Sequence, residues 1–190
     1  NHCELLLGCD YALLRAEFTE LRAQALEKRQ NTKQIKNILI SMGGSDNENC
    51  TYDILQQLSD NFNVTIALGK QSPHNQMLES YAKDKNITTI IDAENMAELM
   101  LNADLAIGAG GSTSWERCCL GLPTLLYVTA DNQKEIAQNL EKTGVVKMVK
   151  NFAQDLQSIV NDFPSWKIMS KNASKVCDGL GSKKILQYVQ

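Results

Sequence analysis

Short apolar segments alternate with helix-like segments from Ile38 to Val149, and this alternation restricts the fold more than any other feature of the sequence. The apolar segments carry Ile, Leu and Val on both faces, as strands that are covered by helices on both sides do. Strands that alternate with helices are typical of α/β proteins with a parallel sheet. The sequence therefore predicts a Rossmann-like, doubly wound parallel sheet. Its strands are expected at 38–42, 64–68, 87–91, 104–108, 124–128 and 145–149.

The segments outside this alternation are interpreted separately. Residues 1–36 do not have the pattern of a complete domain, because a short strand at 3–8 is followed by a polar stretch at 22–36 with a loop at 30–34. We interpret them as an interdomain segment, an extended or helical linker from a missing N-terminal domain. Residues 37–190 are the predicted main domain. Its helices are expected up to about 60 and at 75–85, 96–101, 113–120, 133–142, 153–161, 167–176 and 182–189.

Composition and charge exclude several classes of function. The chain has 190 residues, of which 43% are hydrophobic, and its net charge of −3 includes no run of Lys or Arg, so nucleic acid is not an expected partner. No apolar run approaches the ~20 residues of a membrane span. The six cysteines are scattered without a CxxC pair, so neither a metal site nor a cofactor is expected. Reduced thiols of this kind fit a cytoplasmic protein.

The segment 104–116, DLAIGAGGSTSWE, is the strongest candidate for a functional site. A buried strand leads into a glycine turn, and Ser112 or Thr113 can cap the helix that follows. Such a turn presents unpaired N–H groups and the positive end of a helix dipole, which suit a phosphate. Glu116 lies one turn into the helix, where its carboxylate could reach a ribose. In the alternative interpretation, Glu116 completes a capping box and only reaches back to the backbone of Thr113.

Two further polar turns follow predicted strands. The turn 43–46, Gly-Gly-Ser-Asp, could hold a diphosphate through its backbone, or Ser45 could cap the next helix with Glu48 completing a capping box. The turn 131–133, Asp-Asn-Gln, could bind a sugar or phosphate, or its first two residues could cap the helix after it. Parallel sheets bind ligands at the carboxyl ends of their strands. The three turns together therefore predict a ligand site at that edge.

Residues 37–150 resemble the C-terminal, nucleotide-binding half of the GT-B fold. The matching motifs are ILISMGGSD, ITTIIDAENMAELMLNADLAIGAGGSTSWERCCLGLPTLLYV, and DNQ followed by a helix and KTG. They are similar to the branch that contains the N-acetylglucosaminyltransferase that makes lipid II. The segment GCDYALLRAEF at 8–18 most resembles the interdomain sequence of the UDP-sugar hydrolases of pseudaminic acid biosynthesis. Those hydrolases act on UDP-2,4-diacetamido-2,4,6-trideoxy-β-L-altropyranose.

The resemblance implies a site for UDP and its attached sugar. Glu116 would accept hydrogen bonds from the ribose hydroxyls. The backbone of Ile91 would contact uracil, and Met96 would lie beside the base. The remaining implied contacts are Gly110, Gly111, Ser112 and Thr113 for the diphosphate, Asn132 and Gln133 for the sugar or phosphate, and Gly43, Gly44 and Ser45 for the opposite wall of the cleft.

The resemblance also implies which part of the chemistry lies elsewhere. In the family, a glycine-rich loop of an N-terminal domain carries a catalytic histidine, and these 190 residues contain no such loop. His2 and His74 have no obvious carboxylate partner and are expected on the surface. We therefore expect a UDP-sugar hydrolase whose catalytic residues lie in the N-terminal domain, with this chain inactive alone. The alternatives are a UDP-sugar-dependent GT-B glycosyltransferase and a non-catalytic nucleotide-sugar-binding module.

Overall fold

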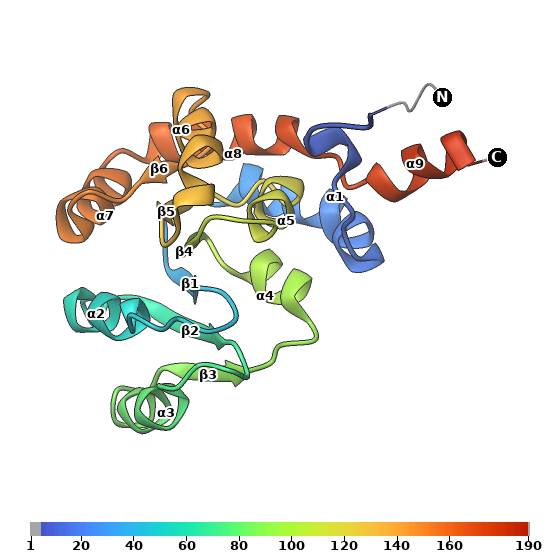
Figure 1. Ribbon diagram of the computed structural model, residues 1–190. Coiled ribbons are helices and arrows are strands. Elements are labelled where there is room, and N and C mark those ends of the chain that lie inside the picture. Colours follow the sequence, from blue (N-terminus) through green and yellow to red (C-terminus); the bar gives the residue numbers. More distant parts are fainter. Residues whose placement is uncertain (1–4, 190) are drawn as a thin grey trace.

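The computed structural model describes residues 5–189 and contains one six-stranded parallel sheet (Figure 1). Its strand order is β3-β2-β1-β4-β5-β6, and every neighbouring pair is parallel. This is the doubly wound arrangement, in which the chain changes direction across the sheet between β1 and β4. The predicted Rossmann-like fold is therefore confirmed. The strands are β1 (Asn37–Ser41), β2 (Asn63–Leu68), β3 (Thr88–Ile91), β4 (Leu105–Ala109), β5 (Thr124–Tyr127) and β6 (Lys147–Met148).

Helices cover both faces of the sheet (Figure 1). One face is covered by α2 (Cys50–Gln57), α3 (Asn75–Asp84) and α7 (Phe152–Asn161), and the other by α1 (Ala16–Asn31), α4 (Met96–Asn102) and α5 (Thr113–Cys119). The chain is completed by the 3-10 turns η1 (Cys9–Tyr11) and η2 (Asp131–Gln133) and by the helices α6 (Lys134–Lys142), α8 (Phe163–Val176) and α9 (Gly181–Val189).

Two hydrophobic cores, one on each face, hold the helices against the sheet. Successive residues of a strand point to opposite faces, so Leu39 contributes to the core with α1, α4 and α5, while Ile38 and Ile40 contribute to the core with α2, α3 and α7. Phe18 of α1 and Trp166 of α8 are fully buried, one in each core. Burial on both faces explains why the strands are apolar throughout.

The segment before β1 differs from the sequence-based expectation. Residues 5–7 form no strand, and the remaining expected strand residues, Cys3 and Glu4, lie outside the described part of the chain. The polar stretch is largely helical, because α1 continues to Asn31 and buries Phe18 and Ala25 completely. The interpretation of 1–36 as a linker from another domain stays a prediction, although α1 packs against this domain.

The last strand is shorter than expected for a local reason. Gly144 has a φ of +67°, in the left-handed region that favours glycine, and it ends α6. The N–H of Val145 then bonds to the carbonyl of Leu140, 2.9 Å away, instead of joining the sheet. Only Lys147 and Met148 are left to form β6 beside β5.

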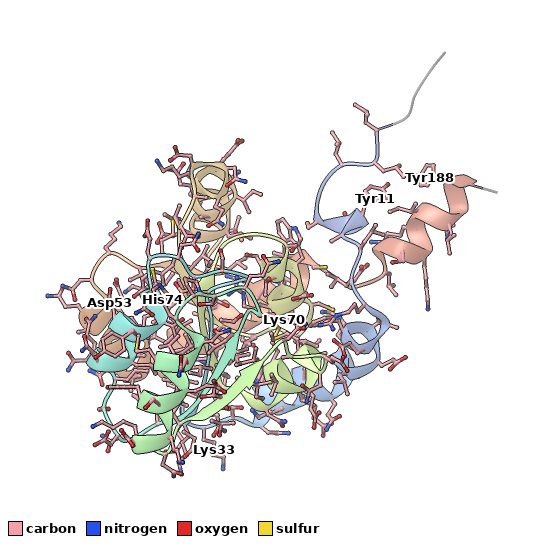
Figure 2. The ribbon with its side chains drawn as sticks, turned by 60° about the horizontal axis from the view of Figure 1, so that its bottom comes forward. Tyr11, Lys33, Asp53, Lys70, His74 and Tyr188 are labelled. Carbon is pink, nitrogen blue, oxygen red and sulfur yellow. The ribbon has the colours of Figure 1, made fainter. Side chains whose placement is uncertain are left out.

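The two ends of the described chain lie side by side. In Figures 1 and 2, η1 and α9 lie next to each other, away from the sheet. The hydroxyl oxygens of Tyr11 and Tyr188 are 3.3 Å apart, and Lys184 of α9 pairs with Asp10 at 3.2 Å. The segment before α1 is therefore held by the last helix rather than by the sheet.

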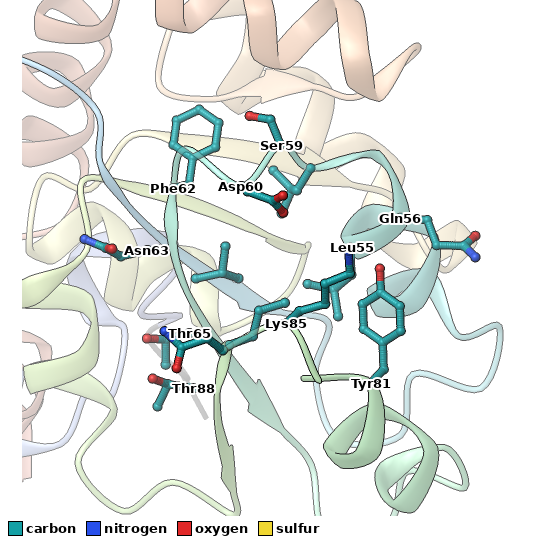
Figure 3. A pocket seen from close by; sticks show the side chains of 14 residues that line it. Leu55, Gln56, Ser59, Asp60, Phe62, Asn63, Thr65, Tyr81, Lys85 and Thr88 are labelled. Atoms are coloured by element: carbon teal, nitrogen blue, oxygen red, sulfur yellow. The ribbon is translucent and has the colours of Figure 1, made fainter. Parts of the chain in front are cut away.

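A cavity of about 510 Å³ opens between α2, α3 and the beginnings of β2 and β3 (Figure 3). Asn63 and Thr88, which line it, begin their strands, so the cavity lies at the amino edge of the sheet. Its charged lining consists of Asp60 and Lys85. Ligands of open parallel sheets bind at the carboxyl edge, so this cavity is separate from the candidate site described below.

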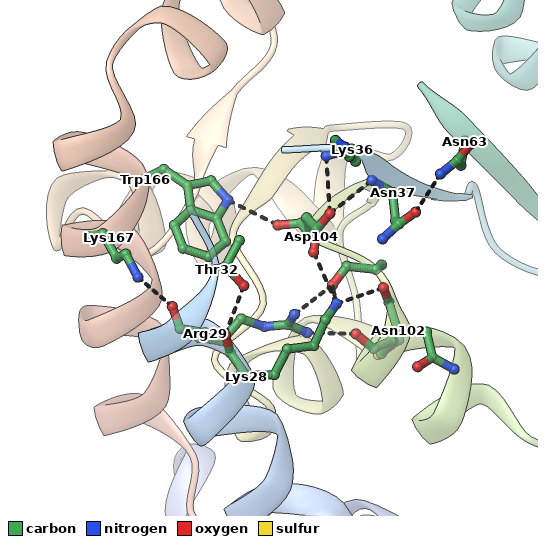
Figure 4. A network of polar contacts seen from close by, with 12 residues as sticks. Lys28, Arg29, Thr32, Lys36, Asn37, Asn63, Asn102, Asp104, Trp166 and Lys167 are labelled. Atoms are coloured by element: carbon green, nitrogen blue, oxygen red, sulfur yellow. Dashed lines mark hydrogen bonds and ion pairs between the residues drawn. The ribbon is translucent and has the colours of Figure 1, made fainter. Parts of the chain in front are cut away.

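The buried residue Asp104 connects α1, β1, β4 and α8 through its carboxylate and its main-chain carbonyl (Figure 4). Asp104 immediately precedes β4 and is 4% exposed. One carboxylate oxygen accepts a hydrogen bond from Nζ of Lys28 at 2.9 Å, and the other accepts from the N–H groups of Lys36 and Asn37 at 3.0 and 2.9 Å. The Asp104 carbonyl accepts from Nε1 of Trp166 at 2.9 Å. The carboxylate thus fixes α1 and the start of β1 relative to β4.

We expect Asp104→Asn to lower the free energy of unfolding by about 3 kcal/mol. An amide cannot accept at both of its ends, so it leaves a buried donor unpaired and the Lys28 ammonium without a counter-charge. Urea unfolding followed by circular dichroism measures the change. Asp131→Asn is the control, because Asp131 pairs with Lys134 at the surface and should matter little. Equal effects of the two substitutions would contradict this role of Asp104.

Candidate functional site

The candidate site lies at the carboxyl edge of the sheet. Because all neighbouring strands are parallel, the segments that follow β1 to β5 emerge at this same edge. The three turns at 43–46, 110–112 and 131–133 lie here, after β1, β4 and β5. The position between β1 and β4, where the chain reverses its direction across the sheet, is where open α/β sheets form a crevice.

The turn between β4 and α5 leaves backbone donors free. Gly111 has a φ of +127°, a conformation that side chains other than glycine rarely adopt. Ser112 occupies the N-cap position of α5, but its side chain makes no capping bond, contrary to expectation. The N–H groups of Gly111, Ser112 and Thr113 donate to no acceptor in residues 5–189. Three adjacent free N–H groups beside a helix N-terminus favour an anion.

Glu116 lies next to this turn and is not part of a capping box. Its side chain is half-buried, and within the described chain it forms neither a hydrogen bond nor an ion pair. The alternative in which it bonds to the backbone of Thr113 is therefore wrong. Burial raises the pKa of Glu116, while the nearby charges of Arg15 and Arg117 act in the opposite direction. The carboxylate is a hydrogen-bond acceptor without a donor.

The turn after β1 is capped by a residue other than the expected one. Helix α2 begins at Cys50, and the carboxylate of Asp46 accepts from the N–H groups of Cys50 and Thr51 at 2.9 and 3.0 Å. The alternative in which Ser45 caps this helix with Glu48 is therefore wrong. Asp46 precedes the first residue of α2 by four positions. Its carboxylate reaches the helix because residues 46–49 form a turn, closed by the bond from the N–H of Asn49 to the Asp46 carbonyl.

The two glycines of this turn have different surroundings. Gly43 has a φ of +92° and open space where a side chain would lie. Gly44 packs against the backbone after β2, since a Cβ added to Gly69 would lie 2.0 Å from the Gly44 carbonyl oxygen. His74 strengthens the same junction, with its Nε2 3.1 Å from the carbonyl oxygen of Asn47. In Figure 2, His74 lies beside α2, the helix that carries Asp53.

The turn after β5 packs directly against the glycine turn. A Cβ added to Gly110 would lie 3.2 Å from Cβ of Gln133. The Gln133 side-chain oxygen accepts hydrogen bonds from the N–H and hydroxyl of Thr129 at 3.1 and 3.3 Å. The alternative in which Asp131 caps α6 is wrong, because α6 has no side-chain cap and Asp131 pairs with Lys134. Gly110 and Gln133 are therefore in contact and form one wall of the candidate site.

A cavity of about 260 Å³ joins the segments after β1 and β5. Ser45 lies on one side of it and Thr129 on the other. Asn132 lies in η2, two positions after the lining residue Ala130, and is exposed. Its side chain does not cap α6. The other lining residues are Met42, Asp46, Asn47, Glu48, Cys50 and Ala130.

Ile91 and Met96 lie further along the same edge. Ile91 ends β3 with 37% of its surface exposed, and Met96 begins α4. Asp92, between them, has a φ of +55°, which is uncommon for a residue other than glycine. Three strand spacings separate β3 from β4, or roughly 14 Å. A ligand that contacts both ends of this row must therefore be elongated.

Arg15 is a residue near the site that residue-level sequence reasoning did not assign to it. Its guanidinium donates to the carbonyl of Glu94, between β3 and α4, at 2.9 Å and pairs with Glu17 at 2.8 Å. Its charge also acts on Glu116. Arg15 thus lies between the β3 end and the α5 end of the site. The only sequence signal for it was its place in the segment 8–18.

The polar groups of the candidate site are mainly backbone donors and one carboxylate. Residues 5–189 contain no cluster of His, Cys, Asp and Glu that could hold a metal ion. Within the same range, no helix is long and apolar enough to cross a membrane. The free N–H groups of the glycine turn, the half-buried carboxylate of Glu116 and small polar side chains together suit ligand binding.

Comparisons with known proteins agree with this geometry. Residues 16–173 match the glycosyltransferase family 28 C-terminal domain. An uncharacterized protein of Methanocaldococcus jannaschii is 36% identical over 67% of this chain and 28% of its own length. A Campylobacter jejuni protein named UDP-2,4-diacetamido-2,4,6-trideoxy-beta-L-altropyranose hydrolase is 31% identical over 75% of this chain and 50% of its own length. This chain therefore spans half or less of these two relatives.

Solved structures show the same fold. The structure of Acinetobacter baumannii MurG matches 87% of this chain and 52% of its own chain with a TM-score of 0.62 and 20% identity. At this identity the likeness concerns the fold alone, and it confirms the expected C-terminal domain of a GT-B fold. The sequence match covers most of the chain, from the first residue of α1 to within α8. The chain belongs to the glycosyltransferase family 28 C-terminal domain family.

Proposed function

We propose that this chain is the UDP-binding half of a UDP-sugar hydrolase. The observation that carries the proposal is Glu116, a half-buried carboxylate without a partner in the described chain, next to three free N–H groups. A ribose diol supplies two hydroxyl donors for such a carboxylate, and a diphosphate supplies acceptors for the N–H groups. A nucleoside diphosphate carries both groups in one molecule.

The proposed ligand follows the carboxyl edge of the sheet. Uracil contacts the backbone at Ile91 beside Met96, and the ribose lies on Glu116. The diphosphate lies on the turn of Gly110, Gly111, Ser112 and Thr113, at the N-terminus of α5. The sugar enters the space near the 260 Å³ cavity, between Gly43, Gly44 and Ser45 on one side and Asn132 and Gln133 on the other.

The proposed reaction is hydrolysis at the anomeric carbon of the sugar. Water attacks C1, the C1–O bond to the diphosphate breaks, and UDP leaves with the bonding electrons. The free N–H groups of the glycine turn stabilise the negative charge that the leaving group gains. A histidine of an N-terminal domain in the same protein takes a proton from the attacking water. This chain binds and orients UDP and supplies no acid or base.

The sugar and the compartment are part of the proposal. The Campylobacter jejuni relative is named for hydrolysis of UDP-2,4-diacetamido-2,4,6-trideoxy-β-L-altropyranose, and we propose this compound as the substrate. The five described cysteines are free thiols, which fits a reducing compartment such as the cytoplasm.

A glycosyltransferase is the second candidate. The family that the chain matches is named for glycosyltransferases, and such an enzyme would use the same UDP site with an acceptor other than water. Product formation by the full-length protein without any added acceptor distinguishes the hydrolase. Release of UDP only when a sugar or lipid acceptor is present would favour the transferase.

Replacement of Glu116 tests the nucleotide site. Charge-assisted hydrogen bonds contribute roughly 1.5–3 kcal/mol each before desolvation, so Glu116→Ala should weaken UDP binding by about tenfold to a hundredfold. Glu116→Gln, which keeps the size of the side chain but loses its charge, should lie between. Calorimetric titration with UDP and 2′-deoxy-UDP measures both variants.

Glu135→Ala is the matched control for this experiment. Glu135 lies in the first turn of α6, at the same edge of the sheet, and is exposed. It should bind UDP as the wild-type protein does. If the wild-type protein binds UDP and 2′-deoxy-UDP equally well and Glu116→Ala changes neither affinity, Glu116 is not a ribose ligand.

The preference for a ribose should depend on pH. An ionised carboxylate accepts from both hydroxyls, and burial raises the pKa of Glu116, so protonation occurs at a higher pH than for an exposed glutamate. The ratio of UDP to 2′-deoxy-UDP affinity should be greatest above this pKa and fall as the pH is lowered through it. Titrations across the acidic range measure the ratio, which cancels protonation of the phosphate. If this ratio depends on pH as strongly in Glu116→Ala as in the wild-type protein, the assignment of Glu116 as the ribose ligand is refuted.

The chain alone should bind UDP without hydrolysing a UDP-sugar. The described residues contain one histidine, His74, and its ring bonds to the carbonyl of Asn47 in a surface loop. We expect no release of UDP above background from UDP-2,4-diacetamido-2,4,6-trideoxy-β-L-altropyranose, followed by phosphorus NMR with purified residues 1–190. Turnover that depends on the protein concentration would place catalytic groups on this chain.

A further inference from the structure

Arg117 lies directly beneath the glycine turn. It follows Glu116 in α5 and is 3% exposed. Its Nη2 donates to the carbonyl of Ala109 at 2.6 Å and to the hydroxyl of Ser114 at 3.2 Å. Its Nη1 lies against Gly108, where an added Cβ would be only 2.4 Å away. The guanidinium thus supports both ends of the turn from the side of the core.

The Arg117 guanidinium makes no direct contact with a carboxylate in the described chain. No ion pair to Arg117 occurs in the described chain, and its Nε has no hydrogen-bond partner. Burial lowers the pKa of Arg117 to about 10, so the side chain is still charged at neutral pH. A buried charge without a partner is costly. The Glu116 carboxylate acts on Arg117 with the opposite charge but makes no hydrogen bond or ion pair to it.

Arg29 shows how the same fold treats a buried arginine elsewhere. It is 2% exposed, burial also lowers its pKa to about 10, and its guanidinium also donates to two carbonyls, of Ala103 and Met100. The carboxylate of Asp104 acts on it with the opposite charge, in the network of Figure 4. Neither guanidinium forms an ion pair in the described chain, because the Asp104 carboxylate pairs with Lys28 and Glu116 acts on Arg117 only from a distance. The two arginines differ in their place, since Arg117 lies beneath the glycine turn and Arg29 lies at the opposite edge of the sheet.

We propose that Arg117 is a positioning residue whose charge favours a diphosphate on the glycine turn. The inference rests on the proposed function. Arg117 does not touch the ligand, since the turn lies between them; it acts through its electric field and by holding the Ala109 carbonyl. The diphosphate of the bound nucleotide then adds negative charge near a guanidinium that has no ion pair in the described chain. Gly108 is required because it lets the guanidinium reach this place.

This role has two consequences for recognition. The site binds a nucleoside diphosphate more tightly than an uncharged nucleoside, and this difference in affinity is larger than the free N–H groups alone would produce. The same field stabilises the UDP leaving group more than the bound UDP-sugar, because breaking the C1–O bond adds negative charge to the diphosphate. Arg117 is thus expected to affect the diphosphate part of the ligand and to leave the uridine part unchanged.

Calorimetric titration of Arg117→Gln with UDP and uridine tests the proposal. Glutamine keeps a hydrogen-bond donor but removes the charge. The preference for UDP over uridine should fall on the order of tenfold, as expected for loss of a unit charge about 10 Å from the phosphates at an effective dielectric constant of about 20. Uridine affinity should stay at the wild-type value. Arg117→Lys, which keeps the charge, should retain most of the preference.

Arg29→Gln is the matched control, because it removes an equally buried guanidinium at the opposite edge of the sheet. It should lower the melting temperature and leave the UDP preference unchanged. Equal loss of UDP and uridine affinity in Arg117→Gln would show a merely structural role and overturn the proposal. An unchanged preference in Arg117→Gln would overturn it as well.

A measurement on the wild-type protein covers the case in which Arg117→Gln does not fold. The Nε resonance of Arg117, followed by nitrogen NMR, should shift on addition of UDP and stay in place with uridine. The same response to both ligands would overturn the proposal. If the wild-type protein binds neither ligand, the proposed function fails together with this inference. If UDP binding depends on Glu116 but not on Arg117, only this inference fails.

Discussion

The rest of the structure depends on the buried carboxylate of Asp104, which holds the amino end of β4 in place. Its hydrogen bonds reach α1, the start of β1 and, through the carbonyl, α8. Since β4 forms one side of the crevice at the carboxyl edge, fixing its amino end also fixes where the glycine turn and Glu116 emerge. The same strand thus has a buried guanidinium near each of its ends, Arg29 at the amino end and Arg117 at the carboxyl end.

Much of the fold could be predicted because the strands are buried on both faces and are separated by helices. Apolar runs such as 38–42 and 64–68 have few other interpretations at that length. For residues 1–36 the sequence left an extended and a helical linker both open, because long charged side chains cover the contacts of α1. Arg22, Lys28 and Arg29 donate to backbone carbonyls at the ends of neighbouring helices, so these polar residues face the domain. A pattern that counts polar residues as exposed does not detect such a helix.

The candidate site was predictable where glycine is required and where a polar residue must follow a strand. The glycine turn and Glu116 were identified on that basis, and the structure leaves their polar groups free. Capping could not be predicted, because Ser45 and Asp46 are both good caps and only the path of the loop decides between them. Arg117 was overlooked because an arginine beside a glutamate is typical of an exposed helix surface, and its burial becomes visible only in three dimensions.

The close contact between Gly108 and Arg117 couples these two positions in evolution. A methyl group at 108 would lie 2.4 Å from Nη1 of Arg117 and 2.5 Å from the Ser41 carbonyl oxygen, so the strand end and the guanidinium share one space. A lineage that replaced the glycine while the arginine remained would pass through an overcrowded intermediate. Loss of the arginine would have to come first, and the neighbouring strand would still obstruct the change. Glycine at 108 is therefore required by two independent contacts, one with the backbone of β1 and one with Arg117.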